Sequence, residues 1–319
     1  MQLKVSYPSR LDLFLSVETG RSRSFIKHQI LSGKVSLNGL PIDKPSQKIR
    51  PEDLITCEFE ENAPSLLAPV EKDLEILHED EDLLILNKEQ GWVVHPASAH
   101  RGDTVVHYLL HHFKNASDFL NISPSRPGIV HRLDRGTSGC LVIAKHRSAL
   151  ENLSKQFKDR LVEKEYEAIV WGKSKPKGLI ATAIGRHRSD RKRMSSKTRV
   201  GKTAETRFET LGQYEYFSWV RLLPKTGRTH QLRVHLSENG NPIVADNLYG
   251  KKRNLEHFGD NLRTFLKGVK YPFLHAKRIT IHHPRTGERL QVEAKHPANF
   301  DTMLRLLTEN EKRVADERE

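Results

Sequence analysis

The stretch that most constrains this chain runs from Gly128 to Lys145. An apolar segment leads into a charged, glycine-rich turn, and a second apolar segment follows it (GIVHRLDRGTSGCLVIAK). Cys140 to Ala144 has the composition of a buried strand. One carboxylate, Asp134, lies inside the turn between Arg132 and Arg135. Because flanking strands would hold this turn rigidly, we interpret Asp134 as a reactive carboxylate rather than a surface charge.

Charge and hydropathy restrict the class of protein and its partners. The chain has 319 residues, enough for about two domains. Its net charge of +13 favours a polyanionic partner, most commonly nucleic acid, with an inert basic surface as the alternative. No apolar run approaches the roughly 20 residues of a membrane span, and the N-terminus has no apolar signal segment. Cys57 and Cys140 are too few for a disulfide framework, so we expect a soluble cytoplasmic protein.

A small first domain is predicted over residues 8–68, with two helices followed by short strands. Leu11, Phe14 and Leu15 share the inward face of the first helix, and Asn38-Gly39 predicts a hairpin turn. Its polar side carries Arg21, Arg23, Lys27, Lys34 and Lys44, which can neutralise phosphates or form an ordinary solvated face. A proline-containing tether at 60–70 leads out of this domain.

The second predicted domain spans residues 71–305 and is rich in strands joined by hairpins. This order favours an α+β fold with a largely antiparallel sheet. We expect a helix that begins with a capping box at Ser148 and Glu151, and a second helix capped by Thr229. The basic segment 173–203 predicts a loop or hairpin that lies on phosphates, or a mobile charged loop. A helix over 299–307 closes the domain, and 306–319 is expected to be a charged tail.

Three histidines invite other functional interpretations. His107 and His111 are four residues apart, but the Glu of a zincin motif is absent, so we expect histidines on a polar helix face and no metal. His131 with Ser138 and Asp134 has the residue types of a catalytic triad. The sequence has no G-x-S-x-G elbow, and we expect His131 to pack structurally.

Two groups of motifs resemble known families. The patterns R-L-D-x-F-L, S-R-S-x-x-K-x-x-I-x-x-G-x-V-x-x-N-G and D-x-I, over about 10–59, are similar to the S-four-like RNA-binding module. H-R-L-D-x-x-T-S-G at 131–139 resembles the signature of the RluA-type pseudouridine synthases. The segments 88–96 and 226–235 resemble two further motifs of that family. The combined architecture is similar to that of family members that modify large-subunit ribosomal RNA.

This resemblance implies a reaction and a set of residues. Asp134 would be the catalytic carboxylate, either attacking the sugar or taking a proton from it. Arg233, with Arg228 as second choice, would keep that carboxylate charged. Tyr166 and Leu232 would enclose a flipped uracil, and Arg132 would fill the gap in the RNA stack. The module's cations Arg21, Arg23, Lys27 and Lys34 would bind phosphates.

The expected partner is therefore RNA, either large-subunit ribosomal RNA or transfer RNA. No metal, organic cofactor, membrane or obligate protein partner is expected, and a monomer is the default. Two alternatives remain: a non-catalytic RNA-binding protein, and a carboxylate glycosidase, which would need a second carboxylate. Two positions depart from the family pattern. Glu89 stands where the opening motif usually has Pro, and Gly136 where the signature turn commonly has an acidic or amide residue.

Overall fold

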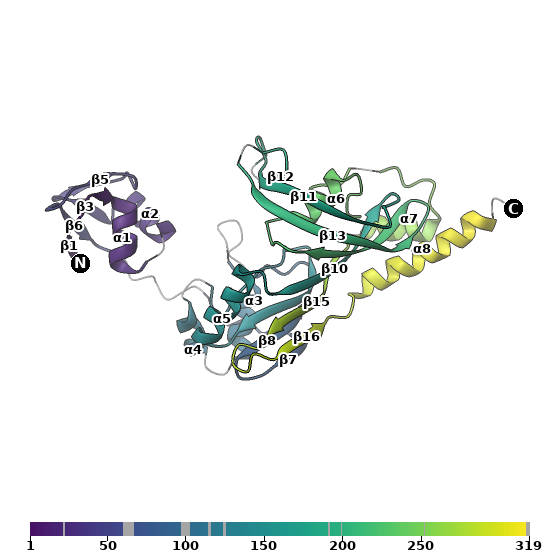
Figure 1. The fold of residues 1–319 in the computed structure, drawn as a ribbon, viewed down its shortest axis with the longest axis horizontal. Helices are drawn as coiled ribbons and strands as arrows, with labels where there is room; N and C mark the ends of the chain where they lie inside the picture. The colour runs from purple at the N-terminus through teal and green to yellow at the C-terminus, as the bar shows by residue number, and fades with distance from the viewer. Residues whose placement is uncertain are drawn as a thin grey trace. The chain divides into compact units, whose positions relative to one another are not determined.

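The computed structural model describes residues 1–21, 23–59, 67–96, 103–113, 116–123, 126–190, 192–198, 200–251 and 253–316. The chain divides into two compact units, Met1–Leu66 and Leu67–Glu319. Most of the expected tether at 60–70, Arg191 and Arg199 of the basic segment, and the last three residues of the expected tail lie outside the described residues. Figure 1 shows both units, coloured from purple at the N-terminus to yellow at the C-terminus.

The first unit packs two helices against short strands. Leu11, Phe14 and Leu15 of α1 are buried as predicted, together with Ile26 and Ile30 of α2. The Asn38-Gly39 turn joins β3 to β4, and both residues have positive φ, as a tight hairpin turn requires. The sheet order is β1-β6-β3-β4, with β2 paired to β5. The elements are β1 (Gln2–Lys4), β2 (Ser9–Arg10), α1 (Leu11–Thr19), α2 (Arg23–Leu31), β3 (Val35–Leu37), β4 (Leu40–Pro41), β5 (Lys48–Ile49) and β6 (Leu54–Cys57).

The second unit is built on one large sheet with the order β12-β11-β13-β14-β10-β15-β9-β8-β7, and β16 also pairs with β15. All pairings between its strands are antiparallel except that of β9 with β15, which confirms the predicted fold class. Figure 1 shows these strands side by side, with α8 in yellow at the end of the chain. The strands are β7 (Ile76–Glu79), β8 (Leu83–Lys88), β9 (Ser138–Ala144), β10 (Glu163–Trp171), β11 (Lys177–Arg186), β12 (Met194–Ser195), β13 (Lys202–Gln213), β14 (Phe217–Pro224), β15 (Leu274–His282) and β16 (Arg289–Glu293).

The central strands are buried on both faces, because alternate side chains enter different cores. In β9, Leu141 and Ile143 face the core under α3 and α4, whereas Cys140 and Val142 face the core under α5. A third core lies between β10, β14 and the later helices. The helices are α3 (Val105–His112), α4 (Ala116–Ile122), α5 (Arg147–Lys158), α6 (Gln231–Glu238), α7 (Asp260–Gly268) and α8 (Ala298–Asp316). Among the described residues, none of the helices has both the length and the apolar character to cross a membrane.

Two predicted helix starts are wrong. α5 begins at Arg147, and its cap is His146, whose ring accepts a hydrogen bond from the amide of Ala149 (3.3 Å), rather than Ser148. The ring is available as a cap because its Nε2 is bound to Asp82 (2.8 Å). α6 begins at Gln231 and not after a Thr229 cap. The Gln231 side chain itself accepts a hydrogen bond from the amide of Arg228 (3.0 Å).

Two further expectations need correction. α8 continues to Asp316, so most of the expected tail at 306–319 is helical; Leu306, Leu307 and Asn310 are buried and hold that part of the helix. His107 is also buried, not on a polar face, because its ring and Thr104 form a capping box at the start of α3. The basic segment 173–203 contains β11 and β12 and leads into β13, and is therefore a hairpin.

Candidate active site

A cavity of about 480 Å³ lies in the second unit, where the turn before β9, strand β10 and the start of α6 meet. Its lining includes every residue that the sequence predicts for the reaction itself: Arg132, Asp134, Tyr166, Arg228, Leu232 and Arg233. Asp134 is the one carboxylate among the described residues that line it, and the other charged lining residues are lysines and arginines. The cations of such a cavity favour a negatively charged ligand, and its single carboxylate is available to the reacting atoms of that ligand.

The Asp134 turn is held in place from behind by the segment that follows β8. Within the turn, the amide of Thr137 donates to the carbonyl of Asp134 (3.0 Å). The amide of Gly91 donates to the carbonyl of Arg135 (2.7 Å), and the Arg135 side chain donates back to the carbonyl of Gly91 (3.1 Å). The side-chain amide of Gln90 also donates a hydrogen bond to the carbonyl of Gly136 (3.3 Å). These reciprocal bonds fix the position of the carboxylate before any substrate arrives.

Glycines at two positions let the turn approach β15 closely. Gly139 has φ of +107°, and a Cβ there would lie 2.2 Å from the carbonyl oxygen of Ala276, so no other residue fits. Gly136 has ordinary φ, but a Cβ there would lie 2.7 Å from the ring of Pro272. The departure from the family pattern at Gly136 is therefore matched by a proline that occupies the space a side chain would need.

Arg233, on the first turn of α6, lies between the carboxylates of Asp134 and Asp246. It forms a bidentate pair with Asp246, with Nε–Oδ2 and Nη2–Oδ1 distances of 2.7 and 2.8 Å. Its third nitrogen, Nη1, lies 3.4 Å from Oδ2 of Asp134. The Asp246 side chain is 0% exposed, and the Arg233 hydrogen bonds hold its pKa below the usual value against the effect of burial. Asp246 thus fixes the guanidinium, which then faces Asp134 with its remaining edge.

His230 also faces Asp134, and sequence reasoning did not identify it. Its Nε2 lies 3.8 Å from Oδ2 of Asp134, and its Nδ1 lies 2.8 Å from the hydroxyl of Tyr249. Burial lowers the pKa of His230, although the charge of Asp134 acts in the opposite direction. Arg228, the second choice for the partner of Asp134, instead donates from Nε to the carbonyl of Thr203 (3.1 Å).

Tyr166 on β10 and Leu232 on α6 both line the cavity. Tyr166 lies on β10 at a bulge, where Ala276 and Lys277 of β15 face it together, and such bulges re-aim a side chain. Its ring packs against two of the cores, so its position is well determined. Burial, with the charge of Asp134, raises the pKa of the Tyr166 phenol, which therefore remains protonated at neutral pH.

Two lysines near the site were also missed. Lys88 is completely buried, and its Nζ donates to the carbonyls of Glu89 (2.8 Å) and Trp92 (3.1 Å). Burial lowers the pKa of Lys88 to about 7, although the charge of Asp134 opposes this. Lys164, which precedes Tyr166 by two residues, lines the cavity, and burial lowers its pKa to about 8. In the sequence, each is a single lysine within a predicted strand, and no local pattern marks it as buried near the site.

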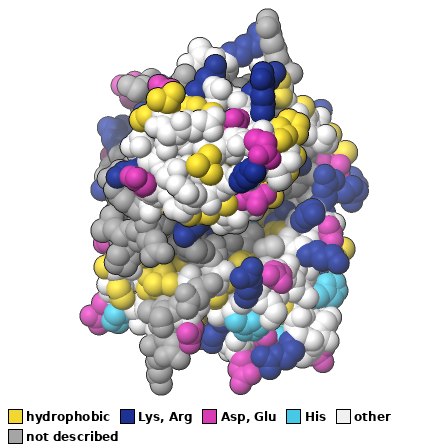
Figure 2. Space-filling view, turned by 90° about the vertical axis from the view of Figure 1, so that its left-hand side faces the viewer, with side chains coloured by type: hydrophobic (Ala, Val, Ile, Leu, Met, Phe, Trp, Pro, Cys, Tyr) yellow, Lys and Arg dark blue, Asp and Glu magenta, His cyan; other side chains and the backbone are white. Residues whose placement is uncertain are grey.

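The cations predicted to bind phosphate differ in their surroundings. In the second unit, Arg132 is exposed at the cavity, beside Asp134 in the chain. In the first unit, Arg23 pairs with the buried Asp12 (2.8 Å), so part of its charge is neutralised. Arg21 lies over the ring of Phe25 (5.3 Å), Lys27 is exposed and Lys34 is half-buried. Among the side chains that Figure 2 colours by type, Lys and Arg lie interspersed with Asp and Glu.

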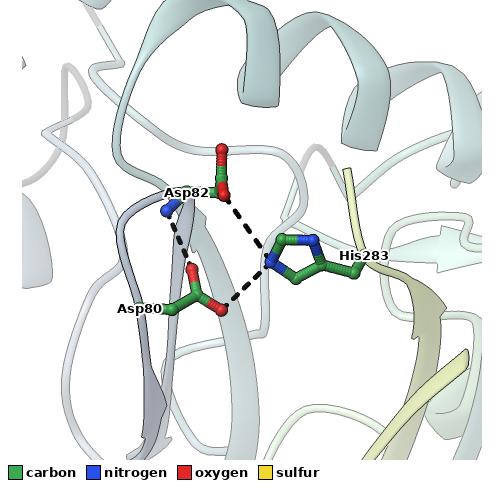
Figure 3. A group of neighbouring side chains, drawn as sticks. All are labelled: Asp80, Asp82 and His283. Carbon is green, nitrogen blue, oxygen red and sulfur yellow. Dashed lines mark hydrogen bonds and ion pairs between the residues drawn. The ribbon is translucent and has the colours of Figure 1, made fainter. Parts of the chain in front are cut away.

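A second group of ionisable side chains lies away from the cavity, at the turn between β7 and β8. Nε2 of His283 lies 3.1 Å from Oδ2 of Asp80 and 3.7 Å from Oδ2 of Asp82 (Figure 3). Arg285 already pairs with Asp82 (2.9 Å), and His78 with Asp80 (2.7 Å). Asp80 also accepts hydrogen bonds from the backbone amides of Asp82 and Leu83 besides its histidine contacts. We therefore assign this group a structural role, tying the β7–β8 turn to the end of β15.

His131 packs as the sequence analysis expects. Its ring stacks on Phe157 with centroids 4.6 Å apart, and its Nε2 accepts a hydrogen bond from the amide of Val142 (2.9 Å). Burial lowers the pKa of His131 to about 3, so it is neutral. The Ser138 hydroxyl is hydrogen-bonded to His275 (2.9 Å) and not to His131. Ser138, His131 and Asp134 therefore do not form a catalytic triad.

A carboxylate held by arginine inside a cation-lined cavity, in a chain with net charge +13, favours an enzyme that acts on a polyanion such as nucleic acid. Comparison with known proteins makes this more specific. The sequence profile of the family described as RNA pseudouridylate synthase matches residues 82–238, and that of the S4 domain matches residues 9–55. The chain belongs to the RNA pseudouridine synthases, which are isomerases.

Relatives in the same family align over nearly the whole chain. An uncharacterized RNA pseudouridine synthase of Chlorobaculum parvum is 38% identical over 94% of this chain and 94% of its own. The ribosomal large subunit pseudouridine synthase D of Yersinia pestis is 34% identical over 93% of this chain and 90% of its own. The solved structure of human RNA pseudouridylate synthase domain containing 4 superposes with a TM-score of 0.56 at 26% identity, covering 73% of this chain and 93% of that one.

Proposed function

We propose that Asp134 is the catalytic carboxylate of this RNA pseudouridine synthase and that its target uridines lie in large-subunit ribosomal RNA. The observation that carries the first part is the 3.4 Å contact between Asp134 and Arg233 inside the cavity. Support for the second part is the match over nearly full length to relatives named ribosomal large subunit pseudouridine synthase D.

The reaction is an isomerisation and requires neither oxidant nor reductant. The bond between carbon-1′ of the ribose and nitrogen-1 of uracil breaks, the base turns, and carbon-1′ joins carbon-5. The proton on carbon-5 is lost, and nitrogen-1 gains one. Asp134 starts the sequence, either by attacking the sugar or by taking a proton from it. In both routes, Arg233 gives this carboxylate a fixed cationic partner.

The other lining residues bind and enclose the extruded nucleotide. A base inside a helical stack cannot reach Asp134, so the uridine must flip out of the stack. Tyr166 stacks on the uracil and helps to move the carbon-5 proton, and Leu232 covers the opposite face of the ring. The exposed Arg132 fills the gap left in the RNA. Arg228, Arg21, Arg23, Lys27 and Lys34 contribute phosphate contacts.

Substitution of Asp134 tests this assignment directly. Transcripts of large-subunit ribosomal RNA, with tritium on carbon-5 of uridine, release tritium when pseudouridine forms. We expect Asp134→Asn and Asp134→Ala to abolish release while RNA binding is retained. The control Asp73→Asn changes an exposed aspartate outside the cavity and should be fully active. Tritium release by Asp134→Ala at the wild-type rate would eliminate Asp134 as the catalytic group.

The same assay compares substrates. Release from transfer RNA transcripts with none from ribosomal RNA would show that the target class is wrong, while leaving the role of Asp134 intact. Free uracil as the product would identify a glycosidase. We do not favour that activity, because Asp246, the other carboxylate that Arg233 contacts, is bound to that arginine and to two backbone amides and does not line the cavity.

A further inference from the structure

We propose that His230 is a positioning residue for Asp134, and that Tyr249 and the backbone of β12 hold it in the one tautomer that directs an N–H at the carboxylate. This role presupposes the assignment of Asp134 as the catalytic carboxylate. It adds a second fixed donor to the site besides Arg233. It also connects the site to the basic hairpin formed by β11 and β12.

Three groups form a continuous chain of contacts that ends at Asp134. The backbone amide of Met194, the first residue of β12, donates to the hydroxyl oxygen of Tyr249 at 2.8 Å. The same hydroxyl lies 2.8 Å from Nδ1 of His230. Nε2 of His230, on the other side of the ring, lies 3.8 Å from Oδ2 of Asp134.

The direction of these bonds follows from the number of protons available. A backbone amide can only donate, so Met194 uses the phenol oxygen as its acceptor. Tyr249 is buried, and His230 Nδ1 is the other polar partner of its hydroxyl among the described residues. The phenol proton would be buried without an acceptor unless it points to Nδ1. Nδ1 is then the accepting nitrogen, and the neutral ring carries its proton on Nε2, facing Asp134.

The charges around His230 determine whether its ring is protonated. The groups that face His230 are Asp134, Arg233, Asp246, Arg132 and Tyr249. Two arginines with two aspartates leave little net charge, so the buried ring is neutral near pH 7. At 3.8 Å its N–H is too far for a full hydrogen bond, but such contacts commonly shorten in the substrate complex.

The backbone provides independent evidence that the placement of His230 is constrained. His230 has φ of +56°, in the left-handed region that a residue with a side chain avoids at a cost of about 1 kcal/mol or more. Tyr249 is itself held by several contacts. The guanidinium carbons of Arg193 and Arg233 lie 5.4 and 5.0 Å from its ring centre, and its amide donates to the buried Asp246 (3.0 Å).

The chain of contacts begins in a segment that we expect to touch RNA. Met194 and Arg193 follow the basic turn of the hairpin, and both contact Tyr249. The contacts from Met194 through Tyr249 and His230 therefore join this hairpin to the surroundings of Asp134.

Nitrogen NMR of the histidine rings in the full-length free protein tests the tautomer without requiring any activity. We expect His230 to carry its proton on Nε2 alone at pH 7, and to become a mixture of tautomers in Tyr249→Phe, which keeps the ring but loses the hydroxyl. The matched control Tyr214→Phe, in the loop between β13 and β14, should leave the His230 signals unchanged. A proton on Nδ1, protons on both nitrogens, or an unchanged tautomer in Tyr249→Phe would each overturn the proposal.

Single-turnover kinetics then tests the positioning role. Tyr249→Phe should slow tritium release about fivefold, the effect of one buried hydrogen bond, while the dissociation constant for RNA stays unchanged. An unchanged rate would refute the positioning role. Loss of RNA binding with a normal bound-state rate would refute it too. If Asp134→Ala retains activity, the proposed function fails, whereas the NMR result on His230 stands separately.

Discussion

Replacement of Asp246 by Asn isolates the electrostatic contact that positions Arg233. Oδ1 of Asp246 accepts bonds from Arg233, Leu248 and Tyr249, and Oδ2 accepts one from Arg233. Asparagine can preserve the bonds at one oxygen, but its amide nitrogen then faces the Nε–H of Arg233. The variant loses one charge-assisted hydrogen bond and leaves the guanidinium without its main counter-ion.

The expected cost is large because both partners are buried. The Asp246 side chain is 0% exposed and that of Arg233 is 12% exposed. Removing one member of such a pair typically destabilises a protein by about 3–5 kcal/mol. Arg233 then moves toward Asp134, its other anionic neighbour, and the rate of tritium release falls as well. A structural effect alone would not lower the rate in the fraction that remains folded.

Urea unfolding monitored by tryptophan fluorescence measures the first effect, since all three tryptophans lie in the second unit. The control Asp260→Asn breaks an exposed aspartate–arginine pair on α7 and should cost at most about 1 kcal/mol. The folded-state pKa of Asp246 lies below its unfolded value, so its stabilisation is present above the normal carboxyl pKa. The difference between wild type and variant must therefore shrink as pH falls below about 4. A cost below about 1 kcal/mol at pH 7 would refute this account of Arg233.

Three further predictions use the same assays. Tyr166→Phe keeps the ring and should retain RNA affinity but lose most tritium release, whereas equal loss of affinity would show that only packing matters. Gly139→Ala places a Cβ against the backbone of Ala276 and should cost more than about 3 kcal/mol of unfolding free energy; the open Gly227→Ala should cost less than about 1 kcal/mol. Lys88→Met should remove a pH dependence of the free energy of unfolding. The folded pKa of about 7 lies below the unfolded value, so wild-type stability rises by about 1–2 kcal/mol between pH 7 and 9, and a flat difference would contradict burial of this lysine.

Local sequence patterns were sufficient for the elements whose signal is short-range. The continuous apolar run of β9, the inward face of α1 and the Asn38-Gly39 turn each depend on neighbours within a few residues, and the structure has them as predicted. The helix starts were less predictable. His146 replaces Ser148 as the cap of α5 because Asp82, more than sixty residues earlier, holds its ring. Such a contact leaves no trace in a local pattern.

The sequence by itself determined the motif around Asp134, the strand that follows it and the residue types available for the reaction. Only the tertiary structure decided that Arg233, and not Arg228, faces the carboxylate, because Asp246 fixes one and Thr203 the other. It also brought His230 to Asp134 through a left-handed backbone. Charge pairing depends on distances between atoms far apart in the chain, and these distances exist only after the sheet has formed.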